Sequence, residues 1–314
     1  MTCGCIARIS SSWTDRQARS TSTWPRWQRL AVAVEDLGFA GLYRSDHFTN
    51  ATPPDKESLE LWVSLTWLAS HTKRIEFGSL VSPLSFRHPA LTARMAAAVD
   101  DLSGGRLTLG LGAGWQEREH HLFGFDLLGP KARFDRFEEG LQVVTRLLRG
   151  DDPVTFEGKY FQLREAILLP RPVRPGGPPI LIGGNGEKRT LPLAAKYADE
   201  WNAIFLLPKE FARMNARLGE MLEANGRSPS SVRRSMMTGL KFGGTKKELK
   251  EKLAVKNKKA DDLRRKGLIV GVGEEIVGQL RALERAGLQR LMLQWLDLDD
   301  LKGLEALAKA VFWG

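Results

Sequence analysis

The sequence predicts an α/β protein in which eight parallel strands close into a single (β/α)8 TIM barrel. Strand-like and helix-like segments alternate along the chain, which is typical of parallel sheets. Most strand-like segments are near-continuous apolar runs, as expected of strands that helices cover. Eight strand–helix pairs fit into 314 residues, a normal length for one barrel. A doubly wound sheet shows the same alternation, and the count of eight favours the barrel.

The expected elements follow one another in strict order. The strands occupy residues 3–9, 39–45, 75–81, 106–112, 179–184, 200–205, 234–242 and 290–296. The helices occupy residues 25–37, 58–71, 89–102, 132–149, 186–197, 208–225, 274–286 and 299–312. The helix at 132–149 carries apolar side chains at helical spacing: Phe134, Phe137, Leu141, Val144 and Leu148. Proline begins several helices and glycine ends others, as at Pro89, Pro130, Pro208, Gly38 and Gly287.

Two connections are longer than the others. Residues 150–178 predict a hairpin before a proline-rich entry to the fifth strand, and residues 243–273 form a lysine-rich insertion. Long loops in a compact domain are often lids or binding loops. No linker divides the chain, so residues 1–314 are expected to form one domain.

The composition indicates a globular protein with an ample core. Hydrophobic residues make up 42% of the chain, and no apolar run reaches membrane-spanning length. The amino end lacks the apolar core of a secretory signal. Cys3 and Cys5 offer no disulfide framework, so a cytoplasmic location is expected. No Cys/His cluster accompanies them, so no metal site is expected.

The net charge of +10 is concentrated in the insertion. Residues 246–266 hold ten Lys/Arg against four Asp/Glu. The pattern is typical of a solvated, mixed-charge helix, and the alternative is a field that attracts an anionic ligand. Aromatic residues are not interleaved with the basic run and no nucleic-acid motif is present, so no nucleic-acid partner is expected.

The stretch at residues 180–202 predicts an anion site. An apolar run ends in Gly183, Gly184, Asn185 and Gly186, and a helix-like segment opens at Glu187. Glycine lets the backbone approach a ligand closely, and a helix N-terminus offers unpaired N–H groups. Together these features suggest a phosphate cradle, although a glycine turn between strand and helix is also ordinary structure.

Several segments resemble the bacterial luciferase-like superfamily, most closely the branch that uses the deazaflavin coenzyme F420. The similar segments are GFAGLYRSDHF (38–48), RHPALTARMAAAVDDLSGGRLTLGLGAGW (87–115), RFDRFEEGLQVV (133–144), VTFEGKYF (154–161), PPILIGGNGEKRTLPLAAKYADEWN (178–202) and GLQRLMLQW (287–295). The resemblance implies a barrel that binds a flavin or deazaflavin at the carboxyl ends of its strands. It also implies a small-molecule substrate and a homodimer, since relatives often dimerise through their second and third helices.

The resemblance assigns roles at the ends of the second and third strands. It implies that Asp46 contacts the cofactor and that His47 takes part in hydride-transfer chemistry, where a histidine can donate or accept a proton near neutral pH. It places a cis peptide bond between Ser79 and Leu80, behind the cofactor ring. Val81 and the neighbouring Ser82 are alternatives for backing the cofactor.

The resemblance also concerns the ends of the fourth and fifth strands. Gly112, Ala113 and Gly114 would let the cofactor lie on backbone. Trp115 stands where sugar-phosphate dehydrogenases of this branch have a proton-donating glutamate, so it predicts an apolar wall or substrate platform instead. Glu119 is a replacement acid or else a solvated residue at a helix start. The Gly183, Gly184 and Asn185 turn matches the family's phosphate site.

The amino end departs from the family pattern. Residues 1–23 are atypical, although 3–9 alternate through Cys5, Ala7 and Ile9 as a strand would. A defective first strand would leave the barrel with an open edge.

The first functional hypothesis is an F420-dependent oxidoreductase that transfers a hydride to or from a small organic substrate. The second is an FMN-dependent monooxygenase supplied with reduced flavin by a partner reductase, and the third is a cofactor-binding barrel without catalysis.

Overall fold

The computed structural model describes residues 4–9, 23–255 and 257–313. Eight parallel strands pair in chain order, and the last pairs with the first, so the predicted (β/α)8 barrel is confirmed. The strands of the ring are β1 (Gly4–Ile9), β2 (Gly41–Arg44), β3 (Glu76–Ser79), β5 (Leu107–Gly112), β8 (Ile180–Gly183), β9 (Glu200–Ile204), β10 (Arg233–Phe242) and β12 (Arg290–Gln294).

The atypical amino end supplies the first strand. Residue Cys5 pairs with Leu291 of β12, and Ile6 pairs with Gly41 of β2. The strand therefore fills the place between β12 and β2 and leaves the ring without an open edge. Cys3, which the prediction included in this strand, lies outside the described residues.

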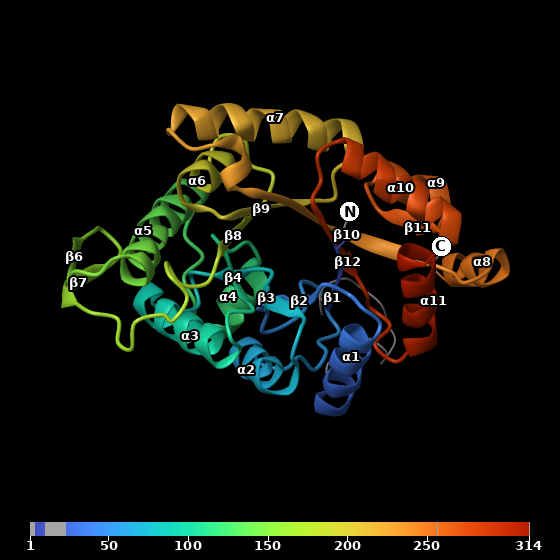
Figure 1. Cartoon of the computed structure of the whole chain (residues 1–314), viewed down its shortest axis with the longest axis horizontal. Coiled ribbons are helices and arrows are strands. Elements are labelled where there is room, and N and C mark those ends of the chain that lie inside the picture. The colour runs from blue at the N-terminus through green and yellow to red at the C-terminus, as the bar shows by residue number, and fades with distance from the viewer. Residues whose placement is uncertain (1–3, 10–22, 256, 314) are drawn as a thin grey trace.

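Eight helices form the outer layer around the strands (Figure 1). They are α1 (Trp24–Asp36), α2 (Leu61–His71), α3 (Pro89–Leu102), α5 (Pro130–Arg149), α6 (Thr190–Tyr197), α7 (Pro208–Ala224), α10 (Gly273–Arg285) and α11 (Leu301–Phe312). All eight predicted helices are present. The sixth begins at Thr190 and not at residue 186, because Pro192 lacks an N–H group and fits only the first turn. None of the helices in the described ranges is long and apolar enough to cross a membrane.

The remaining elements lie in connections. The predicted hairpin consists of β6 (Val154–Glu157) and β7 (Gln162–Ala166), which pair antiparallel. The lysine-rich insertion folds into α8 (Lys246–Ala254), α9 (Ala260–Arg265) and β11 (Ile269–Gly271), and β11 extends the sheet beside β10. The other short elements are β4 (Ser82–Pro83), α4 (Glu117–Phe123) and the 3-10 turn η2 (Pro229–Ser231).

The barrel interior is filled with side chains. A lumen cluster consists of Tyr43, Leu80, Leu181, Met237 and Met292, all buried. A separate and larger core lies between the strands and the helices, with the fully buried Trp27 among its members. The lumen cluster closes the barrel from within, so a ligand must bind at one end of the ring.

Charged side chains occupy the amino-terminal end of the ring. Arg290, the first residue of β12, donates to the Tyr43 hydroxyl at 2.8 Å and to Glu200 Oε2 at 3.0 Å. It also bonds Glu76. Burial raises the pKa of the Glu200 carboxyl above its usual value, although the Arg290 charge opposes this.

Candidate functional site at the carboxyl ends of the strands

The predicted site residues come together at one end of the barrel. Asp46 and His47 follow β2, Val81 follows β3, Gly114 follows β5 and Asn185 follows β8. Since these strands are neighbours and run parallel, their carboxyl ends share one rim. Catalytic groups of (β/α)8 barrels are found at this rim.

His47 is held by a buried carboxylate. Its Nδ1 atom lies 2.9 Å from Glu119 Oε1, and the backbone N–H of Phe48 donates to Glu119 Oε2 at 3.0 Å. Glu119 comes from α4 and is 1% exposed, so the expectation of a solvated helix-start glutamate is wrong. A carboxylate accepts hydrogen bonds, so Nδ1 carries a proton and directs Nε2 away from Glu119.

Aromatic rings lie beside His47 and around the next residue, Phe48. Trp115, 57% exposed, meets the His47 ring edge-on at a centroid distance of 5.8 Å. Phe48 packs against three other phenylalanine rings, with centroids 4.8 to 5.1 Å away. Part of this surface is open to solvent, since Phe123 is 50% exposed. The rim therefore offers an apolar wall close to His47.

Asp46 does not contact His47 through a hydrogen bond. Its Oδ2 atom accepts from the Ser82 hydroxyl at 2.6 Å, and both Asp46 oxygens accept from the Arg87 guanidinium. Arg87 also donates to Glu60 Oε1 at 2.9 Å. The Asp46 carboxylate thus ties the segment after β2 to the segment after β3.

The cis peptide bond lies one residue later than predicted. It joins Leu80 to Val81, whereas the resemblance placed it between Ser79 and Leu80. The Ser79 hydroxyl donates to Gly110 O at 2.7 Å and accepts from Gly110 N at 2.9 Å, so it links β3 to β5. Leu80 belongs to the lumen cluster. Of the three residues, Val81 is the one whose side chain reaches the glycines of the rim.

Glycine is required where the Val81 side chain lies. A Cβ atom on Gly112 would stand 2.6 Å from Val81 Cγ2, and one on Gly183 would stand 3.1 Å from Val81 Cγ1. Gly114 has a φ of +87°, and a Cβ there would approach Ser85 Oγ to 3.0 Å. Ala113, between Gly112 and Gly114, is half-buried against the large core. Val81 and bare backbone therefore form the floor of the rim.

The turn after β8 is fixed to the next strand. The Asn185 side chain donates to Ile204 O at 2.8 Å and accepts from Ile204 N at 2.9 Å. Gly184, with a φ of +129°, accepts from Trp201 Nε1 at 2.9 Å. In the described part of the chain, no acceptor is present for the N–H groups of Asn185, Gly186 and Glu187. These three amides at the approach to α6 are free to bind an anion.

Two neighbouring residues of the site were not predicted. Arg87 lies in the matched segment at 87–115 and binds Asp46. His120 Nδ1 donates to Gln116 O at 2.7 Å, and its Nε2 atom lies 2.8 Å from the Ser85 hydroxyl. No three His, Cys, Asp or Glu side chains in the described ranges are grouped as a metal site requires.

The chain matches one protein family and several characterised relatives. The family model for luciferase-like monooxygenases matches residues 7–259. The chain is 35% identical over 173 residues to 4-hydroxyprotoasukamycin monooxygenase of Streptomyces nodosus subsp. asukaensis, covering 54% of this chain and 45% of that protein. It is 31% identical over 204 residues to F420-dependent hydroxymycolic acid dehydrogenase of Mycobacterium tuberculosis, covering 64% and 55%. It is 30% identical over 222 residues to F420-dependent glucose-6-phosphate dehydrogenase of Kineococcus radiotolerans, covering 68% and 63%.

These matches span between 45% and 63% of the relatives' own lengths. Solved structures match over nearly the whole chain. An F420-dependent secondary alcohol dehydrogenase superposes with a TM-score of 0.80 at 20% identity, covering 99% of both chains. EDTA monooxygenase from Chelativorans sp. BNC1 superposes with a TM-score of 0.84 at 18% identity, covering 98% of this chain and 92% of the other. At such identities the likeness establishes a common fold.

Proposed function

Since the chain belongs to the luciferase-like monooxygenase family, we propose that it is an oxidoreductase that transfers a hydride between coenzyme F420 and a small organic substrate. F420-dependent dehydrogenases among its relatives support this cofactor. One observation carries the proposal: His47, Val81 and the turn at Asn185 lie at the same end of the barrel. A proton-transferring group, an apolar floor and an anion cradle are the three parts that such a reaction needs.

The described residues fit a planar cofactor with an anionic tail. Gly112 and Gly114 contribute no side chain to the floor, and the Val81 side chain packs directly on the backbone of Gly112, where a Cβ would stand 2.6 Å from Val81 Cγ2. Val81, Gly112, Ala113 and Gly114 would border the ring, and the turn from Gly183 to Asn185 would hold the phosphate. When bound, F420 supplies a ring carbon that gives or takes the hydride.

His47 is the proposed proton carrier. Its Nδ1–H is held by Glu119, which directs the ring and leaves Nε2 as the atom that exchanges a proton with the substrate. Asp46 is proposed to hold the rim in place, since Ser82 and Arg87 engage its carboxylate. Trp115 would form the wall that excludes water and positions the substrate.

An FMN-dependent monooxygenase is the second candidate. The 35% identity to a monooxygenase favours it, and the same floor and cradle suit a flavin phosphate. The two candidate reactions differ in their use of oxygen, because turnover of an FMN monooxygenase consumes oxygen.

The test is a titration of the purified protein with oxidised F420 and with FMN, followed by fluorescence. We expect F420 to bind with at least tenfold lower Kd than FMN. Tighter binding of FMN, with oxygenation of a substrate by reduced FMN and oxygen only when the protein is present, would establish the second candidate. If the folded protein binds neither cofactor, the hypothesis of a barrel without catalysis is favoured.

A homodimer is also proposed. The exposed apolar side chains of Val63 on α2 and of Leu91 and Leu102 on α3 support it, each being at least half exposed in the single chain. Light scattering on the purified protein should give twice the chain mass of 35.0 kDa, and a monomeric mass would reject it.

A further inference from the structure

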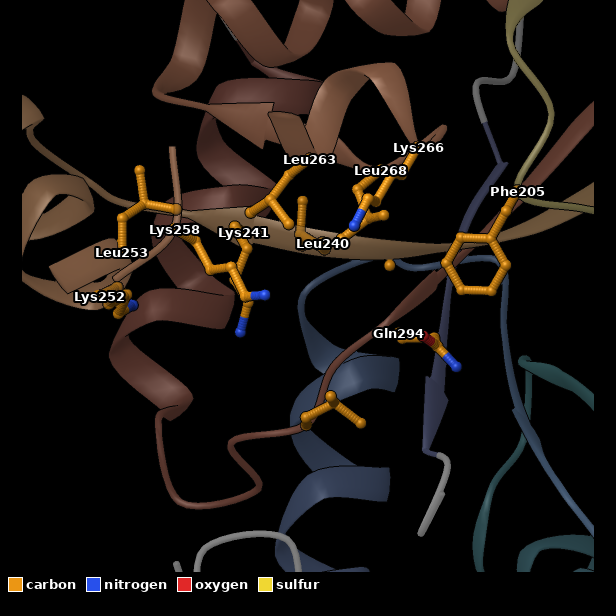
Figure 2. A pocket seen from close by; sticks show the side chains of 12 residues that line it. Phe205, Leu240, Lys241, Lys252, Leu253, Lys258, Leu263, Lys266, Leu268 and Gln294 are labelled. Atoms are coloured by element: carbon orange, nitrogen blue, oxygen red, sulfur yellow. The ribbon is translucent and has the colours of Figure 1, made fainter. Parts of the chain in front are cut away.

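A cavity lies beside the rim, under the lysine-rich insertion (Figure 2). Its volume is about 550 Å³, within the range of small-molecule sites. One wall is the carboxyl-terminal part of β10 and the opposite wall comes from α8, α9 and the residues around them. We call it the lysine pocket, after its lysines Lys241, Lys252, Lys258 and Lys266.

Most of the pocket wall is apolar. The side chains of Phe205, Leu240, Leu253, Leu263, Leu268 and Leu296 line it. Leu240 and Leu263 are buried in the protein, so this wall is held by packing. Besides the lysines, Gln294 at the end of β12 is the polar side chain that lines the pocket. Such a wall cannot satisfy the hydroxyl groups of a sugar, and buried polar groups without partners are costly.

The lysines are not equivalent. Lys252 is neutralised by Glu248 at 2.7 Å and by Asp300 at 2.9 Å. Lys241 already interacts with another group of the protein. Lys258 and Lys266 are exposed, and their ammonium groups have no carboxylate partner among the described residues. Two positive charges at the edge of an apolar cavity are therefore available to a ligand.

The lysine pocket adjoins the proposed cofactor floor. Phe205, which follows β9, lines the pocket and also packs against the lumen cluster, as Val81 does. Gln294 and Leu296 lie at the carboxyl end of β12, on the same rim as His47. A molecule in the pocket would thus reach the rim from the β9–β12 side, opposite the strands that carry the cofactor residues.

We infer that the lysine pocket is the substrate subsite and that the substrate is an amphipathic anion, with an anionic head group on an apolar body. Lys258 and Lys266 bind the head group, and the leucines and Phe205 cover the body. The inference rests on the proposed function, because a substrate subsite presupposes the reaction beside it. It gives the lysine-rich insertion a second role besides that of a solvated surface.

The test is direct binding, measured by calorimetry on the full chain at low salt. The probes are decanoate and decyl phosphate, with decanol as the neutral control and glucose 6-phosphate as the polar control. We expect both amphipathic anions to bind more tightly than either control. Decanoate and decyl phosphate together distinguish a carboxylate head from a phosphate head.

The charge is tested with K258Q/K266Q, which should raise the Kd of the anions about tenfold and leave decanol unchanged. The matched control, K246Q/K250Q, removes two charges from α8 residues that do not line the pocket, and it should change the Kd less than twofold. Equal weakening by both variants would overturn the inference, as would binding of glucose 6-phosphate as tight as that of decanoate.

The two proposals can fail separately. If F420 binds and neither amphipathic anion does, the substrate subsite is refuted and the proposed function stands. If decanoate binds in a lysine-dependent manner while neither F420 nor FMN binds, the proposed function is refuted, and with it the role of the pocket in the reaction.

Discussion

His47 Nδ1 lies 2.9 Å from Glu119 Oε1, and the two residues stand 72 positions apart in the chain. The same carboxylate accepts from the Phe48 backbone through its other oxygen. Both oxygens of Glu119 therefore face N–H donors, and His47 Nδ1 also lies 3.1 Å from Oε2. A glutamine at this position has one oxygen and one NH2 group, so one donor would face another donor.

The first prediction is that Glu119→Gln impairs turnover without abolishing cofactor binding. Loss of the ring's orientation should lower kcat by up to about 10²-fold, since small misplacements of catalytic groups have such effects. Nitrogen-15 NMR of the imidazoles should show His47 protonated at Nδ1 in the wild type and mixed between its nitrogens in the variant. Glu117→Gln, on the exposed face of the same helix, is the control. An unchanged kcat and an unchanged His47 spectrum would contradict the role of Glu119.

The second prediction concerns the floor of the rim. Gly112→Ala places a Cβ 2.6 Å from Val81 Cγ2, so Val81 must move. Overpacking of this kind costs about 1–3 kcal/mol, and F420 affinity should fall about tenfold, equivalent to about 1.4 kcal/mol. The midpoint of urea unfolding measures the loss of stability, and titration with F420 measures the loss of affinity.

The matched rescue is V81A/G112A, which removes the clashing methyl groups and should recover stability. Gly219→Ala inside α7 is the control for a methyl group added without a clash, because a Cβ there meets nothing within 4 Å, and it should stabilise the helix by about 0.5–1 kcal/mol. If Gly112→Ala is as stable as Gly219→Ala and binds F420 normally, Val81 does not form the floor.

The third prediction tests the anion cradle. Asn185→Ala removes two hydrogen bonds to Ile204, each worth about 1 kcal/mol. The turn should loosen, and F420 should bind at least tenfold more weakly. A shortened cofactor without its phosphate should bind the variant and the wild type equally. If both forms of the cofactor weaken alike, Asn185 serves the barrel and not the phosphate.

The barrel could be predicted because each strand is a local apolar run and each helix has its own apolar stripe. The turn at Gly183 was predicted for the same reason, since its glycines and the following helix are contiguous in sequence. The start of that helix was misplaced because a glycine-rich turn and a first helical turn look alike until Pro192 is taken into account.

The candidate site was less predictable, because its chemistry comes from contacts distant in sequence. The short helix α4 is polar and lacks an apolar stripe, so the burial of Glu119 against His47 had no local signal. The contact between Val81 and Gly112 depends on the register of two strands. The lysine pocket needs β10, β12 and the insertion together, whereas the sequence showed only that the insertion is basic.

The fourth prediction concerns stability and its pH dependence. Arg290 is buried and bonds Tyr43, Glu200 and Glu76 at once. Arg290→Met leaves the buried Glu200 with only the half-exposed Arg233, 3.6 Å away, as a cation, which should cost about 3 kcal/mol of unfolding free energy at pH 7. Arg281→Met, an exposed arginine on α10, should change it by less than about 0.5 kcal/mol.

Glu200 determines how that cost varies with pH. Burial raises the pKa of its carboxyl, so between the unfolded and the folded pKa the folded protein binds more protons there than the unfolded chain does. This contribution to stability is complete below the unfolded pKa and is lost as pH rises through the folded pKa. Removing Arg290 raises the folded pKa further, so the deficit of Arg290→Met should be largest at pH 8 and should shrink toward pH 5. Urea unfolding of both proteins across this range measures the difference, and a deficit independent of pH would show that Glu200 does not titrate in response to Arg290.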